Sequence, residues 1–303
     1  MSPLSPTFTL SPGQRAIWFA QQTNPTSTEY QCAELLTFDT TVDVEVLSQV
    51  IADCLETLPV FQAHYAGPHE ATAWPHRITV EHCGTVAGDV QQWAAQRITE
   101  VADPALRGDT LTKHWLATLP DGTVVWLARF HHITGDGFAI NALLSWLGEA
   151  YTARVAGKPL PKNHLTCDYS TISDAEPTQK VADYWAHAGV SAPESIMSAQ
   201  PVDDEMVLAS AIISTTERAK LRTIHPVEME TLATVAAFYV SAFSSPDAAT
   251  VTLGMPLMNR PLGQSQVALT PMVSVLPLVV PVSSSQPMTI PEVAQAFRGL
   301  RAH

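Results

Sequence analysis

One stretch organises the sequence, Phe130-His131-His132-Ile133-Thr134-Gly135-Asp136-Gly137-Phe138. Two adjacent histidines end a run typical of a β-strand, and an Asp-Gly pair then begins a run typical of a helix. A strand–turn–helix corner of this kind can hold a base, a carboxylate and exposed backbone N–H groups close together. Because side chains alternate along a strand, we expect His131 and His132 to point to opposite sides of the sheet and to serve different functions.

Each polar group of this corner has an expected chemistry. A neutral imidazole is a natural proton acceptor near pH 7. Asp136 stands where a carboxylate can cap a helix or pair with a buried cation. Gly137 lets another chain approach the backbone, and an exposed N–H there could meet a developing oxyanion. The alternatives are a histidine pair with no role and a metal site. Opposite-facing histidines cannot both reach one ion without a bulge, so we expect no metal.

Composition excludes several classes of function. The chain has 303 residues, of which 46% are hydrophobic and 15% charged, as in a core-rich globular protein. The net charge of −13 argues against nucleic acid and anionic membranes as partners. No apolar run reaches membrane-spanning length, and the first residues lack the basic and apolar regions of a signal peptide, so we expect no membrane span and no secretion. The cysteines show no CxxC spacing, which favours a reducing cytosol over a disulfide framework or zinc: Cys32, Cys54, Cys83 and Cys167.

Strand and helix signals alternate along both halves of the chain, which indicates an α/β or α+β class with helices layered on sheets in two lobes. We expect a first lobe over 1–160, a polar, proline-broken connection over 161–180 and a second lobe over 181–303. Strands are expected at 30–38, 60–65, 112–119, 123–130, 206–213, 250–255 and 272–280. Helices are expected from Pro12, at 44–55 and 86–98, from Gly137 to Gly157, from Thr215, from Pro226 to Phe243 and from Ile290.

The organising stretch matches a family signature. His131-His132-Ile-Thr-Gly-Asp136-Gly137 resembles the HHxxxDG motif of nonribosomal peptide synthetase condensation domains, members of the chloramphenicol-acetyltransferase-like superfamily. Further segments resemble the family in the same order: Leu10–Gln22, Asp168-Tyr169, Gly254–Arg260 and Met272–Leu278.

The resemblance implies two chloramphenicol-acetyltransferase-like lobes in a V shape. The second lobe is expected to be incomplete, because the family's last strands and the segment that covers its channel would follow residue 303. The opening motif begins ten residues from Met1, so we expect no domain ahead of it.

A finer similarity points to the condensation domains that open catechol-siderophore synthetases of the enterobactin and bacillibactin type. It rests on Arg129–Phe138, on Leu276-Pro277-Leu278 and on the arginine-rich end, Arg298–His303. Two positions depart from the family pattern. Leu55–Pro59 replaces an Arg-His-Glu motif, and Ser274 replaces a usual asparagine.

Site roles also follow from the resemblance. His132 is implied to be the catalytic residue, either as the base for the attacking amine or as the group that orients it. His131 and Asp136 are implied to be structural, with Arg260 as the partner of Asp136 in a pair that joins the lobes. Gly137 is implied to support close approach.

The partners implied are two carrier proteins that present substrates on phosphopantetheine arms. An upstream aryl or acyl carrier protein would bring the donor, and a downstream peptidyl carrier protein would bring the acceptor. The adenylation domain of the same synthetase would follow. No cofactor is expected to be bound by the chain itself.

Two other functions stay open, a coenzyme A-dependent acyltransferase of the same superfamily and a non-catalytic docking platform. The intact His131, His132 and Asp136 argue against the platform. His131 excludes the cyclising variant, which has aspartate there, and a position at the chain start disfavours an epimerase.

Overall fold

The structure is a computed structural model, and it describes residues 7–38, 42–99, 106–167, 178–188, 212–244, 248–260, 266–282 and 288–301. The chain forms two compact units, each described by itself here. The first comprises Met1–Ser173 and Asn259–Val273, and the second comprises Asp174–Met258 and Ser274–His303. No helix among the described residues is long and apolar enough to cross a membrane.

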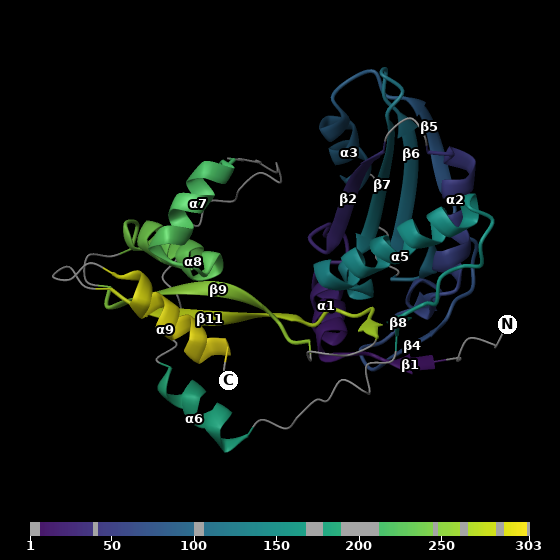
Figure 1. Cartoon of the computed structure of the whole chain (residues 1–303). Coiled ribbons are helices and arrows are strands. Elements are labelled where there is room, and N and C mark those ends of the chain that lie inside the picture. Colours follow the sequence, from purple (N-terminus) through teal and green to yellow (C-terminus); the bar gives the residue numbers. More distant parts are fainter. Residues whose placement is uncertain are drawn as a thin grey trace. The chain divides into compact units, whose positions relative to one another are not determined.

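The first unit is built on a four-stranded sheet with the order β2-β7-β6-β5 (Figure 1). β7 pairs antiparallel with both neighbours, and β5 joins β6 in parallel. The elements of this unit are β1 (Thr7–Thr9), α1 (Pro12–Thr23), β2 (Gln31–Phe38), α2 (Val44–Glu56), η1 (Pro59–Phe61), β3 (Ala63–His64), β4 (Glu70–Ala73), β5 (Val80–Thr85), α3 (Val90–Thr99), α4 (Gly108–Leu111), β6 (Thr112–Thr118), β7 (Val124–His131), η2 (His132–Thr134), α5 (Gly137–Val155), β8 (Leu165–Thr166) and β10 (Val267–Ala268).

Helices cover both faces of this sheet (Figure 1). Every residue of β7 is buried, and successive side chains enter different cores. Trp126 and Phe130 belong to the main core, which α2 and α5 complete, whereas Leu127 packs with Trp115 and Ala94 of α3. Burial on both faces fixes the register of the strand, and with it the position at which β7 ends beside the predicted corner.

The second unit packs three helices around a two-stranded sheet of β9 and β11, and the described residues include one further helix, α7. Its core contains Ala237, Val280 and Phe297, one from each packed layer. The elements are α6 (Gln179–His187), α7 (Thr215–Ile224), α8 (Glu228–Ser241), β9 (Thr250–Met258), β11 (Val273–Pro281) and α9 (Ile290–Arg301).

The mixed α/β class is confirmed, and most predicted elements are present within a few residues of their expected bounds. One predicted strand is wrong, and one strand was not predicted. Val60–Tyr65 is a 3₁₀ turn followed by a two-residue strand, because Pro59 presets a helical first turn. The polar run Val80–Thr85 is an exposed edge strand that hydropathy does not reveal. The strand expected over 206–213 falls largely outside the described residues.

The predicted lobe boundaries also need one correction. Residues 259–273 were placed in the second lobe, but this segment belongs to the first unit. The reason is pairing: β10 joins β8 in parallel, with Val267 opposite Leu165 and Ala268 opposite Thr166. A segment from late in the chain therefore completes the unit that holds the His-His corner.

Candidate active site

The backbone of the corner is held at each step between β7 and α5. β7 ends at His131, and His132 opens the 3₁₀ turn η2, so His132 lies just past the strand in which it was expected. The His132 N–H donates to the Tyr30 carbonyl at 2.7 Å, and the Thr134 hydroxyl donates to the His131 carbonyl at 2.8 Å. Gln14 of α1 donates its side-chain N–H to the Ile133 carbonyl at 3.0 Å. The turn that carries His132 is thus anchored by Tyr30, which directly precedes β2, and by α1.

His131 is enclosed by the fold, with an exposed fraction of 3%. Its Nδ1 accepts the Ile133 N–H at 3.2 Å, and its Nε2 lies 3.1 Å from the side-chain oxygen of Gln21. Burial and the neighbouring His132 and Arg129 lower the pKa of His131 to about 4. An imidazole that is buried, neutral and bonded at both nitrogens suits a structural role.

His132 differs from its neighbour in exposure and in bonding. Its side chain is partly exposed. Its Nδ1 is buried and has no hydrogen-bond partner among the described residues. The two histidines therefore occupy different environments, although His132 lies in η2 and not in the strand on which the alternation argument was based. Of the two, His132 keeps side-chain hydrogen-bonding capacity that the described part of the fold does not use.

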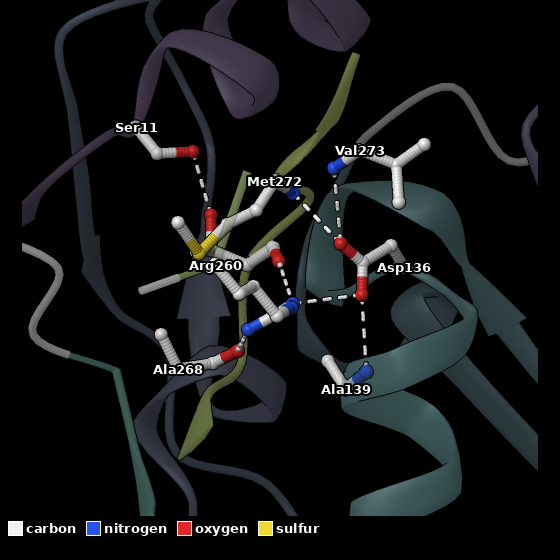
Figure 2. Close-up of polar contacts among 8 residues, drawn as sticks. Ser11, Asp136, Ala139, Arg260, Ala268, Met272 and Val273 are labelled. Carbon is white, nitrogen blue, oxygen red and sulfur yellow. Dashed lines mark hydrogen bonds and ion pairs between the residues drawn. The ribbon is translucent and has the colours of Figure 1, made fainter. Parts of the chain in front are cut away.

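Asp136 lies at the centre of a hydrogen-bond network, with a side-chain exposure of 2% (Figure 2). One carboxylate oxygen accepts the Ala139 N–H at 3.0 Å, which caps α5, and accepts Arg260 Nη2 at 2.7 Å. The other oxygen accepts the N–H groups of Met272 at 2.8 Å and Val273 at 3.1 Å. Both oxygens are satisfied twice, so Asp136 is fully committed to structure.

The electrostatics of Asp136 favour the ionised form. Burial raises the pKa of its carboxyl group, but the N–H groups of Ala139 and Met272 and the charge of Arg260 lower it by more. The net pKa lies below the ordinary value, so the group is a carboxylate at neutral pH.

Arg260 is the predicted partner of Asp136, and the ion pair is present. Its guanidinium also donates to the carbonyls of Ala268 (Figure 2) and Thr270, each at 3.0 Å. The same guanidinium lies 5.0 Å from the centre of the Phe138 ring. Both partners belong to the first unit, so the expectation that this pair joins two lobes is corrected. The pair instead holds the returning segment 259–273 against the start of α5.

Gly137 presents open backbone beside the corner. It is exposed, and a Cβ built on it would meet nothing within 4 Å. As the first residue of α5, its N–H has no acceptor within the helix, because the first intrahelical bond is donated by Ile140 to Asp136. The expected room for close approach is therefore present. Within the described ranges, no group of three His, Cys, Asp or Glu side chains is arranged to hold a metal ion.

Several residues of the network were not predicted as part of the site. Gln14 could be identified as a capping-box residue of α1, but its bond to Ile133 depends on tertiary packing. Gln21, buried beside His131, gives no local signal. Ser11 bonds Thr270 at 2.6 Å in addition to capping α1, which links the first helix to the returning segment. The Asp168-Tyr169 pair lies outside the described residues.

Comparison with known proteins defines the class to which this fold and corner belong. The model of the condensation domain family matches residues 5–303, so the chain belongs to that family. A variant of the starter condensation domain of rhizomide synthetase RzmA, in complex with C8-CoA, has a TM-score of 0.77. It is 18% identical, and the match covers 98% of this chain and 72% of that one. This likeness confirms the condensation-domain fold.

Two curated relatives are similar over nearly the whole chain. An isonitrile lipopeptide synthase from Streptomyces coeruleorubidus is 26% identical over 298 residues, covering 90% of this chain and 20% of that protein. A dimodular nonribosomal peptide synthase from Bacillus subtilis (strain 168) is 24% identical over 322 residues, covering 98% of this chain and 13% of that protein. The chain thus spans a fifth or less of these relatives.

Proposed function

We propose that the chain catalyses amide bond formation between two carrier-bound substrates in nonribosomal peptide synthesis. The acceptor amine attacks the carbonyl carbon of the donor thioester and forms a C–N bond. The C–S bond then breaks, the donor carrier keeps the sulfur, and the proton lost by the amine ends on that thiol. No oxidant, metal or bound cofactor enters this balance. The phosphopantetheine arms belong to the carrier proteins, and the chain acts with an upstream donor carrier, a downstream acceptor carrier and an adenylation domain.

One observation carries this proposal: His132 is partly exposed on a turn whose backbone is fixed, and it is followed in the sequence by exposed Gly137, whose N–H has no acceptor within α5. A fixed imidazole can take the amine proton or hold the amine in line for attack. An unpaired N–H at a helix start can stabilise the oxyanion of the tetrahedral intermediate. His131 and Asp136 are buried, Arg260 is partly buried, and all three are hydrogen-bonded, so they hold the geometry.

The finer proposal concerns the donor, which we take to be an aryl group such as 2,3-dihydroxybenzoyl. It rests on the similarity of Arg129–Phe138 to the opening domains of catechol-siderophore synthetases. The alternative donors are a fatty acyl carrier, as the name of the lipopeptide synthase relative suggests, and a coenzyme A thioester, as the C8-CoA complex of the rhizomide domain suggests.

The test of the reaction uses the full-length protein with donor and acceptor carriers that have been loaded beforehand. His132→Ala should lower the rate of amide formation by about 100-fold or more, as expected for loss of a positioned acid–base group. The matched control is His82→Ala, since that histidine is exposed and remote in the sequence. Undiminished amide formation by the His132 variant would exclude the proposal.

The same assay separates the donors. Dihydroxybenzoyl carrier, fatty acyl carrier and free acyl-coenzyme A are supplied one at a time with one acceptor. The aryl carrier should give the highest kcat/KM. Product from acyl-coenzyme A without any carrier would instead establish the acyltransferase alternative, and no product with any donor in the unaltered protein would favour the docking platform.

A further inference from the structure

The amide group of Gln21 has only one possible orientation. Gln21 lies on α1 with 3% of its surface exposed. Its side-chain nitrogen is within 3.1–3.2 Å of three backbone carbonyl oxygens, those of Asn24, Pro25 and Ser27. Carbonyl oxygens can only accept hydrogen bonds, so the NH₂ group must face them. The side-chain oxygen of Gln21 therefore faces His131.

This orientation decides which nitrogen of His131 carries the proton. The Gln21 oxygen lies 3.1 Å from Nε2 and can only accept, so Nε2 must be the donor. In the neutral ring Nδ1 is then the acceptor, and it accepts the Ile133 N–H at 3.2 Å. The other tautomer would place two donors face to face at Ile133 and two acceptors face to face at Gln21. The hydrogen bonds thus form a chain with one direction: Ile133 of η2 donates to His131, His131 donates to Gln21, and Gln21 donates to the carbonyls of the loop 24–27.

Ile133 is the central residue of the turn that begins with His132. Its N–H is held by His131 and its carbonyl by Gln14, so the two faces of one peptide segment depend on two glutamines of α1. If the ring proton of His131 were on Nδ1, it would face the Ile133 N–H, and the two donors would repel each other. Because a displacement of about 1 Å can lower an enzymatic rate on the order of 100-fold, such a shift would matter at His132.

We propose that Gln21 is a positioning residue for the condensation reaction. It fixes the tautomer of His131, and through it the placement of the turn that presents His132. The proposal rests on the function proposed above. It adds a residue from the first helix to the machinery, and it assigns His131 a defined polarity rather than a merely space-filling role.

Two substitutions of Gln21 separate polarity from packing, with Gln22→Met as control because Gln22 is its exposed neighbour on the same helix. Gln21→Met keeps the length of the side chain but removes its acceptor together with the NH₂ donor that faces the loop carbonyls. It should lower kcat by about 10- to 100-fold with a small change in KM. Gln21→Glu also loses that donor, but it keeps an acceptor toward His131 and adds a charge that favours protonated His131, in which the Nδ1–H would oppose the Ile133 N–H. Its rate should fall at a higher pH than that of the unaltered protein.

The other groups that bear on this titration are His132 and the Arg129 guanidinium, which both disfavour a charged His131. The Tyr30 ring packs 6.4 Å away, centre to centre. These neighbours are unchanged in the Gln21 variants. A change in the pH at which the rate falls on acidification, between Gln21→Glu and the unaltered protein, is therefore due to the substitution at Gln21. Identical pH–rate profiles for the two proteins would overturn the proposal.

A measurement independent of activity is the tautomer itself. In the full chain labelled with ¹⁵N-histidine, the His131 ring should show the proton on Nε2, and Gln21→Met should reduce that preference. A proton on Nδ1 in the unaltered protein would overturn the proposal even if Gln21→Met failed to fold. Full activity of His132→Ala would instead contradict the proposed function while leaving this spectroscopic result intact.

Discussion

The carboxylate of Asp136 shows how a single side chain can hold a corner of the fold together. It accepts four hydrogen bonds, three from backbone N–H groups and one from Arg260. Two of those N–H groups lie more than 130 positions later in the sequence, so one charge holds together residues that are remote along the chain.

Asp136→Asn should destabilise the first unit by about 3–5 kcal/mol, because it leaves the buried guanidinium of Arg260 uncompensated. Urea-induced unfolding measures the loss. Asp53→Asn removes one partner of an exposed ion pair, Asp53 with Arg154 at 3.0 Å, and should change the stability by less than about 1 kcal/mol. Equal effects of the two substitutions would show that burial of the Asp136 pair has no energetic weight.

Among single residues, some roles could be predicted and others could not. A difference between His131 and His132 was expected, but strand alternation does not account for it, because His132 lies in η2 beyond the end of β7. The cap at Asp136 follows from its place before a helix. The pairing with Arg260 came from resemblance alone, because no local pattern connects positions 136 and 260. The backbone donors of Met272 and Val273 could not be predicted, since any residue type supplies the same N–H group.

Helices and strands were predictable where their signals are local. Ser11 and Gln14 form the capping box of α1, Ser214 and Glu217 form that of α7, and Gly157 ends α5 with a φ of +62°. β5 was missed because it lies at an edge of the sheet, where a strand needs no apolar alternation. Elements with local capping or turn residues can therefore be predicted from the sequence. An edge strand such as β5 can be recognised only when its pairing partner in the folded sheet is known.

The first helix, α1, packs closely against Pro271 of the returning segment, and a substitution at Gly13 tests this contact. A Cβ added to Gly13 would lie 2.3 Å from the Pro271 carbonyl oxygen, so Gly13→Ala forces α1 away from the returning segment. We expect a loss of about 2 kcal/mol or more in unfolding free energy, as for an overpacked contact.

Gly148 is the matched control in α5, because a Cβ there meets nothing within 4 Å. Gly148→Ala should stabilise the protein by about 0.5–1 kcal/mol through helix propensity. Thermal unfolding of the two variants should therefore shift in opposite directions, and a stabilising Gly13→Ala would contradict the contact with Pro271.

The acid stability of the fold as a whole depends on histidines that it buries without charge. Burial, with the nearby Arg129, lowers the pKa of His114 to about 3, and the pKa of His131 is lowered to about 4. Both values lie below the ordinary 6.5, so the unfolded chain binds more protons than the folded one between these limits.

Stability should therefore be full above pH 6.5 and fall as the pH drops toward 4. Each histidine contributes up to about 1.4 kcal/mol per pH unit, or roughly 2 kcal/mol at pH 5. Urea unfolding at several pH values measures the slope. His114→Gln should reduce that slope by about half, whatever its effect on stability at pH 7. An unchanged slope would mean that His114 does not titrate as its burial requires.

At the scale of the chain, two mixed α/β units were predictable from the alternation of signals, but the assignment of residues 259–273 was not. No local pattern in that segment indicates which unit it joins, and its place is set by the β8–β10 pairing and by the contacts of Arg260. The sequences of two short strands that are far apart along the chain give little indication that the strands pair with each other.

The return of residues 259–273 to the first unit has a consequence for biosynthesis. Asp136 and Arg260 are 124 positions apart, so a ribosome adding roughly 5–20 residues per second needs about 6–25 s to make the partner after the carboxylate. During that interval the nascent first unit holds an acidic group that cannot be buried unpaired without a large penalty. Final closure of the corner around His132 must therefore wait until the ribosome has passed residue 273, whatever order the earlier strands and helices fold in.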